Sequence, residues 1–417
     1  MSRPRCVLAY SGGLDTSVAI RWLQEQLGYD VVTLTADLGE TPDMESVTSR
    51  ALATGARSAH VVNARRVFVD HFCFPTLAAG ALYQNVYPLA TALARPLIAK
   101  LLVDVAREEG AVAVAHGCTG KGNDQVRFDV AVGALAPELQ VVAPVRDWDM
   151  GRPQEIEYAR QHGVEVPVTT ESPYSVDANL WGRSVECGVL EDPWAAPPPD
   201  VYAWTAAAAE APGPVDVEIT FEHGVPVALR GEALEPDALV TELNALAGAH
   251  GVGRIDHVED RLVGIKSREV YEAPAATVLH AAHAALESLT LTRDVLRFKQ
   301  RVAGEWAHLV YDGLWFGALR TALHEFVNAT QEVVSGDVRI RLNRGTATIS
   351  GRRAPQSLYQ PQLATYDRVS DMFDHSAARG FIELFGLPLR TQTRVQGALH
   401  DAVPLQVPKV VRRRDAS

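Results

Sequence analysis

The segment at residues 11–17 combines two adjacent glycines with hydroxyl and carboxyl side chains, directly after an apolar run at residues 6–10. Adjacent glycines can adopt positive φ, so their backbone amides can turn into one concavity. Ser11, Thr16 and Ser17 add hydroxyl donors around it. Residues 16–27 are expected to form a helix whose first, unpaired amides face the same anion. The segment predicts an anion-binding loop suited to pyrophosphate; the alternative is a glycine turn without a ligand.

A second glycine-rich segment at residues 116–124 follows the apolar run 111–115. Its three glycines allow a close backbone approach to a ligand, and Lys121 adds a compact positive charge suited to phosphate. Asn123 or Asp124 can cap the helix that follows. Asn123 and Arg127 are four residues apart and share a helical face, so both can point toward a carboxylate or ureido group. The alternative is a glycine-rich turn with a capped helix and a solvated arginine.

The elements that must position these loops follow from the apolar pattern. Continuous apolar runs predict strands at 6–10, 31–36, 59–62, 111–115 and 140–144, and helical spacing predicts helices over 44–54, 65–82, 93–109 and 124–135. This alternation is typical of the α/β class with a doubly wound parallel sheet, whose ligands lie beyond the carboxyl ends of the strands. Both glycine loops follow such ends, so we expect them to open into one crevice.

The second half of the chain has an α+β pattern. We expect an extended Pro- and Ala-rich connector over 192–215, hairpins around 223–224 and 343–345, a helix near 236–249 and a long helical stretch over 276–328. At 417 residues, more than one domain is expected. We predict a nucleotide-binding domain at 1–165, an α+β synthetase domain at 166–385 and a C-terminal extension at 386–417 that serves oligomerisation. The basic end at 410–414 could instead fray in solvent.

Composition narrows the class of function. The chain is 47% apolar and 22% charged, near the average of soluble globular proteins, and its net charge is −12. The acidic balance disfavours nucleic acid as a partner and favours small polar metabolites. The four cysteines form no Cys-x-x-Cys pair, no apolar run is long enough to span a bilayer, and the first strand begins at once. We therefore expect a cytoplasmic protein without a membrane partner.

The first loop resembles the Ser-Gly-Gly-x-Asp-Ser/Thr loop of the N-type ATP pyrophosphatases, the PP-loop enzymes, and neither common nucleotide fingerprint. A longer resemblance covers nearly the whole chain. The chain is similar to the argininosuccinate synthase family in the ordered segments AYSGGLDTS, ARPLIAK, HGCTGKGNDQVRF, SVDANLWGRSVECGVLEDPW, HGVGRIDHVEDRLVGIKSREVYEAP and GRRAPQSLY. The segments in the second half have no reason to accompany a generic PP-loop.

The resemblance implies ligation of L-citrulline and L-aspartate to argininosuccinate in arginine biosynthesis, through a citrullyl-adenylate, with release of AMP and pyrophosphate. It also implies a cytoplasmic homotetramer with ATP as co-substrate and Mg²⁺. The residues that it assigns to ATP are Ala9, Tyr10, Ser11, Gly12, Gly13, Leu14, Asp15, Thr16, Ser17, Ala36 and Gly117. Those that it assigns to aspartate are Thr119, Asn123 and Asp124, and those for citrulline are Tyr87, Asn123, Arg127, Ser175, Ser184, Glu259 and Tyr271.

Three residues, Asp15, Lys121 and Asp124, have expected catalytic roles. Asp15 is a carboxylate near the metal, Lys121 spreads the negative charge that develops at phosphorus, and Asp124 orients the aspartate amine and favours its proton loss. Metal ligands themselves cannot be assigned. Purely structural roles are the alternatives to the substrate assignments. Ser175 and Ser184 could cap turns, Glu259 could be a solvated acid, and Tyr87 and Tyr271 could be half-buried core aromatics.

The chain departs from the family pattern at three positions. Ala92 lacks a hydroxyl that the family places there, for which Thr91 is the candidate replacement; Val86 replaces an arginine, and Glu40 replaces a glutamine. These departures motivate an alternative, a paralogous ligase that adenylates another ureido or amide compound. A tRNA-modifying PP-loop enzyme and a non-catalytic nucleotide-binding scaffold are further alternatives, disfavoured by the acidic balance and by the intact loops respectively.

Overall fold

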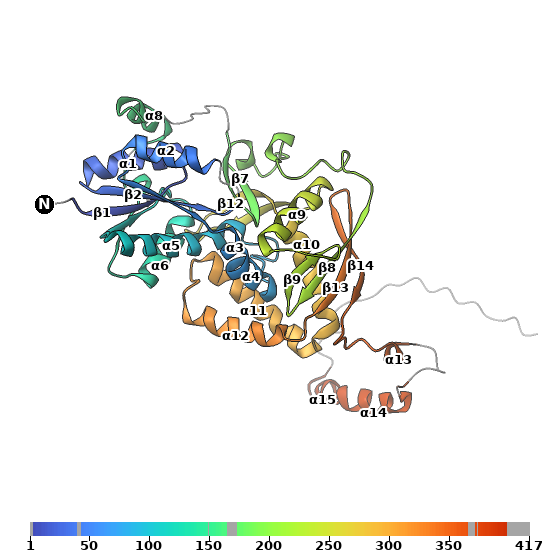
Figure 1. The fold of residues 1–417 in the computed structure, drawn as a ribbon. Helices are drawn as coiled ribbons and strands as arrows, with labels where there is room; N and C mark the ends of the chain where they lie inside the picture. Colours follow the sequence, from blue (N-terminus) through green and yellow to red (C-terminus); the bar gives the residue numbers. More distant parts are fainter. Residues whose placement is uncertain are drawn as a thin grey trace, which may run out of the picture. The chain divides into compact units, whose positions relative to one another are not determined.

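The computed structural model describes residues 3–39, 43–148, 150–164, 173–365, 372 and 374–397 (Figure 1). The chain forms two compact units, Met1–Leu358 and Tyr359–Ser417. The smaller unit holds α13 (Pro361–Ala364), α14 (His375–Phe385) and α15 (Leu387–Gln396). The predicted domain boundaries stay predictions. The basic end at 410–414 and the departure at Glu40 lie outside the described residues.

The first part of the larger unit contains a five-stranded parallel sheet in the order β3-β2-β1-β4-β5. Its strands are β1 (Arg5–Ala9), β2 (Asp30–Asp37), β3 (Ser58–Asn63), β4 (Ala113–Ala115) and β5 (Gln140–Val142). The predicted doubly wound sheet is confirmed. Strand β5 is shorter than expected because Pro144 begins the short helix α7 (Pro144–Asp147). The strand order reverses between β1 and β4, and both glycine loops follow these two strands.

Helices cover both faces of this sheet (Figure 1). Side chains alternate along β1, so Cys6 and Leu8 pack with α1 (Leu14–Gln26), α2 (Met44–Thr54) and α8 (Arg152–Gln161). Val7 lies on the other face with α5 (Ala90–Glu109) and α6 (Asp124–Leu135). Helices α2 and α6 have the bounds predicted for them. Burial on both faces explains why the strands read as continuous apolar runs.

One local prediction in this part needs correction, and one helix was missed. The helix expected over 65–82 is α3 (Arg65–Phe68), a π-helical turn (Val69–Cys73) and α4 (Phe74–Ala79), which ends at Gly80 with φ of 70°. Pro75 lies in the first turn of α4, where its missing N–H costs little. Helix α8 was not predicted. The sequence does contain a helix-start signal, a Gln three residues after the N-cap residue: Gly151 at the N-cap donates its N–H to Gln154 Oε1 (3.2 Å).

The second part of the larger unit contains two antiparallel sheets. One has the order β11-β12-β7-β6, with β6 (Ser175–Asn179), β7 (Gly182–Glu186), β11 (Arg254–Asp260) and β12 (Lys266–Glu272). The other has the order β10-β9-β8-β13-β14, with β8 (Val215–Glu222), β9 (Val225–Leu229), β10 (Glu232–Ala233), β13 (Gly336–Asn343) and β14 (Thr346–Arg353). Both predicted hairpins are confirmed.

Helices α9 (Pro236–Ala249), α10 (Pro274–Thr290), α11 (Arg293–Tyr311) and α12 (Ala318–Gln331) complete this part. The helical stretch expected over 276–328 is therefore three helices. It breaks at Thr292, whose backbone is extended, and near Gly313, whose φ is 80°. One apolar core runs from α4 and α5 to α10, α11 and the sheet of β8 and β13, so the parts on either side of residue 165 share buried packing. Among the described helices, none is long and apolar enough to cross a membrane.

Candidate active site

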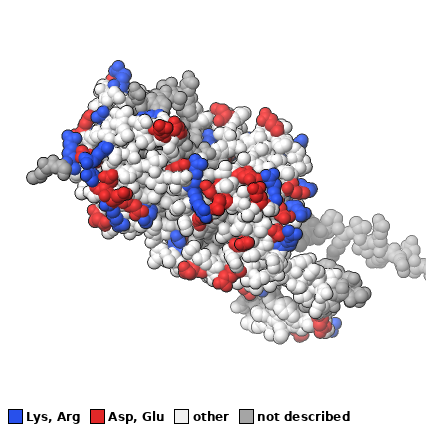
Figure 2. All heavy atoms as spheres, viewed as in Figure 1, with Lys and Arg blue, Asp and Glu red and all other residues white. Residues whose placement is uncertain are grey.

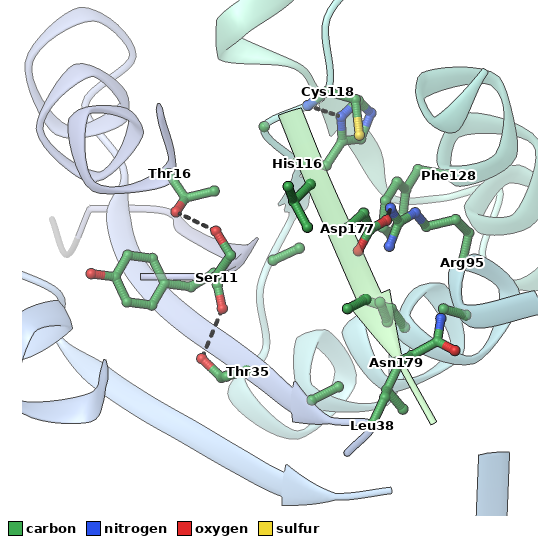
Figure 3. A pocket seen from close by; sticks show the side chains of 18 of the residues that line it. Ser11, Thr16, Thr35, Leu38, Arg95, His116, Cys118, Phe128, Asp177 and Asn179 are labelled. Carbon is green, nitrogen blue, oxygen red and sulfur yellow. Dashed lines mark hydrogen bonds and ion pairs between the residues drawn. The ribbon is translucent and has the colours of Figure 1, made fainter. Parts of the chain in front are cut away.

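A cavity of about 670 Å³ lies beyond the carboxyl ends of β1, β2 and β4 (Figure 3). Six residues assigned to ATP line it: Ala9, Tyr10, Ser11, Thr16, Ala36 and Gly117. The two loops lie side by side. Gly117 of the second loop is so close to Thr16 of the first that a Cβ added to the glycine would lie 3.0 Å from Thr16 Cγ2. The expectation that both loops open into one crevice is confirmed.

The first loop has the geometry of an anion cradle. Gly12 has φ of 79°, and the Gly13 N-cap has no side chain that occupies the first amides of α1. Ser11 Oγ lies 3.2 Å from Thr16 Oγ1, and Tyr10 Oη lies 3.0 Å from Ser17 Oγ, so the hydroxyls are fixed beside the turn. Arg50 from α2 donates to the Gly12 carbonyl (2.7 Å).

Gly12→Ala should disable this loop. A Cβ at Gly12 would meet Arg50 Nη1 at 3.2 Å and Val47 at 3.3 Å, in a backbone conformation that costs an L-residue about 1–2 kcal/mol. We expect the KM for ATP to rise by roughly tenfold, measured by pyrophosphate release. Gly133→Ala is the matched control, since a Cβ at this site in α6 meets nothing within 4 Å. Equal kinetics of the two variants would contradict the cradle.

Asp15 contacts a second carboxyl group outside the lining of the nucleotide cavity. It lies beside Glu155 of α8 and is not among the residues that line the cavity. Burial and then the charge of Asp15 raise the pKa of Glu155 to about 7 from its usual 4.5. Asp15 and Glu155 are therefore a carboxyl pair in which Glu155 keeps its proton up to near neutral pH.

Glu155→Gln should change the pH dependence of stability. The folded-state pKa of Glu155 is raised, so the folded protein holds a proton that the unfolded chain releases between pH 4.5 and about 7. The free energy of unfolding should fall as the pH rises through this window, and urea unfolding of Glu155→Gln should lack that part of the fall. The exposed neighbour Glu157→Gln is the control. Parallel curves for the wild type and Glu155→Gln would contradict the carboxyl pair.

Beside the cavity, two arginines and two aspartates form a partly buried charge network. Arg95 from α5 donates to Asp124 (2.8 Å) and contacts Asp177 from β6; Arg127 donates to Asp124 (2.7 Å). Figure 3 shows Arg95 and Asp177 together at the cavity. Burial acts to raise the pKa of Asp124, but the two guanidinium groups outweigh it and hold that pKa well below its usual range. Asp124 is thus an ionised anchor that joins the nucleotide cavity to Arg127.

Tyr311 at the end of α11 joins the residues predicted for citrulline. Its hydroxyl accepts from Asn123 Nδ2 (2.8 Å) and donates to Glu259 Oε1 (2.6 Å), and its carbonyl accepts from Arg127 Nε (2.8 Å). Asn123 therefore does not cap α6 with its side chain; its oxygen accepts instead from the backbone N–H of Leu262 (2.9 Å). The solvated reading of Arg127 is also wrong, because the residue is 4% exposed.

The strand β11 brings Glu259 into the same cluster. Glu259 is 2% exposed and also accepts from the hydroxyl of Tyr271 (2.6 Å), so the solvated-acid alternative is wrong. The Tyr271 hydroxyl lies 2.9 Å from Glu269 as well. Burial and then the charge of Glu259 raise the pKa of Glu269 to about 8. Two carboxyl groups therefore meet at one phenol, and Glu269 is the one that burial favours in its protonated form.

The remaining predicted substrate residues fall into two groups. Tyr87 is fully buried, stacks on Tyr271 with ring centroids 4.1 Å apart, and its hydroxyl lies 2.7 Å from Thr91. Both tyrosines belong to the hydrophobic core and are more deeply buried than the core-aromatic alternative expected, so that alternative stays beside the substrate assignment. Ser184 lies inside β7, in register with Tyr271, and does not cap a turn. Ser175 begins β6 and is exposed, and Thr119 and Lys121 are exposed on the second loop.

Sequence reasoning missed several residues that shape the site. Glu272 is fully buried and accepts from the N–H groups of residues 203–205 (2.9 Å each) and from Arg183 (2.8 Å), which fixes the connector against the cavity. The overlooked residues are Arg95, His116, Asp177, Asn179, Arg183, Trp204, Glu269, Glu272 and Tyr311. All of them except Trp204 and Tyr311 lie in segments that carry the family resemblance, but nothing in those segments assigned them a role.

A doubly wound parallel sheet with a Ser-Gly-Gly-x-Asp-Thr loop at its switch point defines the class of PP-loop ATP pyrophosphatases. Two family models match the chain: the arginosuccinate synthase N-terminal HUP domain over residues 5–165 and the arginosuccinate synthase C-terminal domain over residues 174–392.

Curated relatives agree over almost the full length. The argininosuccinate synthase of Rubrobacter xylanophilus is 57% identical over 411 residues, which cover 98% of this chain and 99% of the relative. Those of Geobacillus kaustophilus and Dehalococcoides mccartyi are 56% and 54% identical, covering 97% and 95% of this chain and 99% and 98% of the relatives. The chain belongs to the argininosuccinate synthase family, the ATP-dependent ligases of arginine biosynthesis that join citrulline to aspartate.

Proposed function

We propose that this chain makes argininosuccinate in two steps at the site described above. The ureido oxygen of citrulline forms a bond to the α phosphorus of ATP, and the bond to the β-phosphate oxygen breaks to release pyrophosphate. The amine of aspartate, after loss of a proton, then attacks the ureido carbon of the citrullyl-adenylate, and the C–O bond breaks to release AMP. The carrying observation is Arg95, which lines the nucleotide cavity and binds Asp124, itself bound to Arg127 of the amino-acid cluster.

ATP lies in the cavity of the two loops, with its β- and γ-phosphates on the amides that follow Gly12 and its base toward Ala36. The exposed ammonium group of Lys121 spreads charge on the α-phosphate. Among the described residues, no three His, Cys, Asp or Glu side chains form a metal cage. This fits a Mg²⁺ ion that would be held mainly by phosphates and water, with Asp15, which does not line the cavity, acting on it through water. Such an ion supplies neutralisation of phosphate charge.

Citrulline occupies the cluster of Tyr87, Arg127, Glu259 and Tyr271, with Thr91, Ser175 and Ser184 at its edge. A ureido oxygen is a weak nucleophile, so alignment by this rigid cluster is the main contribution of the protein. Thr119 and Asn123 bind the aspartate carboxylate near the start of α6, where negative charge is favoured. The ionised carboxylate of Asp124 orients the aspartate amine. Because the pKa of Asp124 is low, this carboxylate holds the amine in place and is not the group that accepts its proton.

We further propose a cytoplasmic homotetramer that acts on small molecules and binds no nucleic acid. All four cysteines are free thiols, as a reducing compartment requires. Basic and acidic side chains are interspersed on the face shown in Figure 2, with no broad basic surface for a polyanion. Helix α15 leaves Leu387, Leu389 and Val395 exposed, which supports the use of the C-terminal extension in oligomerisation.

A substrate panel tests this function. Pyrophosphate release should be measured with ATP, aspartate and, in turn, citrulline, homocitrulline, ornithine and simple ureas. We expect citrulline to be the best substrate by at least tenfold, because the cluster presents both charged and neutral partners to one amino acid. An inactive citrulline beside an active analogue would contradict the proposal and support the paralogous ligase.

A further inference from the structure

Asp177 brings a carboxyl group into the nucleotide cavity. It lies on β6, and among the described residues that line the cavity it supplies the only carboxyl group (Figure 3). Its side chain is 38% exposed, so a ligand in the cavity can reach it. The second step of the proposed reaction needs a group that accepts a proton from the amine of aspartate, and the low pKa of Asp124 excludes that residue.

The surroundings of Asp177 connect it to the residues predicted for both amino acids. Its Oδ2 atom accepts from Arg95, which also holds Asp124 (2.8 Å), a residue predicted for aspartate. Its partner across the sheet is Ser184 of β7, predicted for citrulline, and Ser184 Oγ lies 3.4 Å from the Asp177 carbonyl oxygen. If the ligands bind as proposed above, the Asp177 carboxylate lies where ATP, citrulline and aspartate meet.

The charges around Asp177 suit a proton acceptor better than those around Asp124. Asp124 is bound by two guanidinium groups, whereas Asp177 is bound only by that of Arg95, which it shares. Burial raises the pKa of Asp177, Arg95 lowers it and the charge of Asp124 raises it again, so this pKa lies above its usual value. The titratable and charged groups that face Asp177 are Arg95 of α5, Asp124 of α6, Cys118 of the second loop and, on the neighbouring strand β7, Arg183, which pairs with Glu272.

The other groups of the cavity wall that could act as bases are already engaged or keep their protons. Both ring nitrogens of His116 are occupied, Nε2 by Asp129 (2.8 Å) and Nδ1 by the backbone N–H of Cys118 (3.3 Å). Burial raises the pKa of the Cys118 thiol and that of the Tyr10 hydroxyl, so both groups are protonated at neutral pH. Among the described residues of the cavity wall, Asp177 is therefore the group that can accept a proton.

We propose that Asp177 is the general base of the second step, an inference that rests on the ligation proposed above. Its carboxylate takes one proton from the ammonium group of aspartate, which leaves the nitrogen with a lone pair for attack on the ureido carbon. The C–N bond forms, the C–O bond to AMP breaks, and the electron pair of the broken bond stays on the AMP oxygen. The nitrogen of aspartate loses its second proton to water after the C–N bond has formed. The ureido nitrogens keep their protons, so the product is a guanidinium ion, and Asp177 returns its proton to water through the cavity.

Asp177→Asn should separate the two steps of the reaction. Adenylation is measured in single turnovers, as the pyrophosphate that acid liberates from enzyme, ATP and citrulline without aspartate. Argininosuccinate formation is measured after aspartate is added. We expect the variant to adenylate citrulline within about threefold of the wild-type rate and to form argininosuccinate about 100-fold more slowly or worse, the factor for a lost general base. Equal losses in both steps, or no loss in the second, would overturn the proposal.

Hydroxylamine distinguishes a base from a residue that only maintains the cavity. Its nitrogen is largely unprotonated at neutral pH, so its attack on the adenylate needs no proton acceptor beforehand. Asp177→Asn should therefore react with hydroxylamine within about threefold of the wild-type rate, although its reaction with aspartate is slow. A loss with hydroxylamine as large as the loss with aspartate would overturn the role as a base.

Two further variants complete the test. Asp177→Ala leaves space for formate, which should raise argininosuccinate formation by about tenfold or more. This rescue decides the question where Asp177→Asn fails to fold, and a folded Asp177→Ala enzyme that formate does not rescue would overturn the proposal. Asp256→Asn is the matched control, because Asp256 of β11 in the same sheet also pairs with an arginine, Arg268 (2.6 Å), and its side chain is 42% exposed. Neither step should change in this control.

Failure of the proposed ligation would give a different result. A wild-type enzyme that liberates no pyrophosphate from ATP and citrulline would overturn the ligation and this inference together. Normal adenylation combined with normal argininosuccinate formation in Asp177→Asn would overturn only the role of Asp177.

Discussion

Asp124→Asn is expected to reduce kcat/KM for citrulline at least 100-fold and to lower the free energy of unfolding by about 3 kcal/mol. The carboxylate holds both Arg95 and Arg127, and Arg127 is almost completely buried. A neutral amide leaves these guanidinium groups with one fewer negative partner in a low-dielectric site. The stability loss is placed at the low end for a buried ion pair because the Asp124 side chain is 27% exposed.

Two measurements check this expectation. Urea unfolding reports stability, and pyrophosphate release well below the unfolding temperature reports catalysis. Asp104→Asn is the matched control, since Asp104 pairs with Lys100 on the exposed face of α5 and its loss should cost less than about 1 kcal/mol. If Asp124→Asn behaved like Asp104→Asn in both assays, Asp124 could not be the anchor between the two parts of the site.

Tyr311→Phe is expected to have the second largest effect. The missing hydroxyl leaves Glu259 Oε1 and Asn123 Nδ2 each without a partner inside a buried cluster. The cost of such unpaired groups is about 1–3 kcal/mol. We expect a KM for citrulline raised by 10-fold or more and a smaller change in the KM for ATP, measured by initial rates of pyrophosphate release. The ring itself remains, so its stacking on Tyr83 is retained.

Tyr158→Phe is the matched control, because it removes a tyrosine hydroxyl outside the site. Tyr158 in α8 also donates to a carboxylate, Glu25, at 2.9 Å, but near the surface. We expect its substitution to leave both KM values unchanged. A Tyr311→Phe enzyme with normal KM for citrulline, or with equal rises for citrulline and ATP, would be inconsistent with a cluster dedicated to the amino acid.

Local patterns were sufficient for most of the nucleotide-binding half. The strands are buried on both faces, so each is a short continuous apolar run, and α2 and α6 show their helical period without interruption. Breaks inside long helical patterns were harder. The end of α11 had a local signal in Gly313, whose φ is 80°, whereas no sequence signal marked the π-helical turn after Phe68.

The residues of the site likewise fall into those that local sequence could predict and those whose partners are distant in the chain. The glycine loops were predictable because turn geometry and the helix start depend on neighbouring residues. The partners of Asn123 were not, because its side-chain oxygen, which would cap α6, accepts instead from the backbone N–H of Leu262, 139 residues away. Asp15 shows the same limit, since its neighbour Glu155 comes from α8. Only the family resemblance predicted Glu259 and Tyr271 as substrate residues. Their residue types alone favoured a solvated acid and a core aromatic.

The most direct test of the central claim follows one oxygen atom. Citrulline labelled with ¹⁸O in its ureido group should be converted with ATP and aspartate, and the AMP analysed by mass spectrometry. If the ureido oxygen attacks the α phosphorus in the cavity between the two loops, each AMP should carry one ¹⁸O atom and the pyrophosphate none. Label in the pyrophosphate, or AMP without label, would contradict the account.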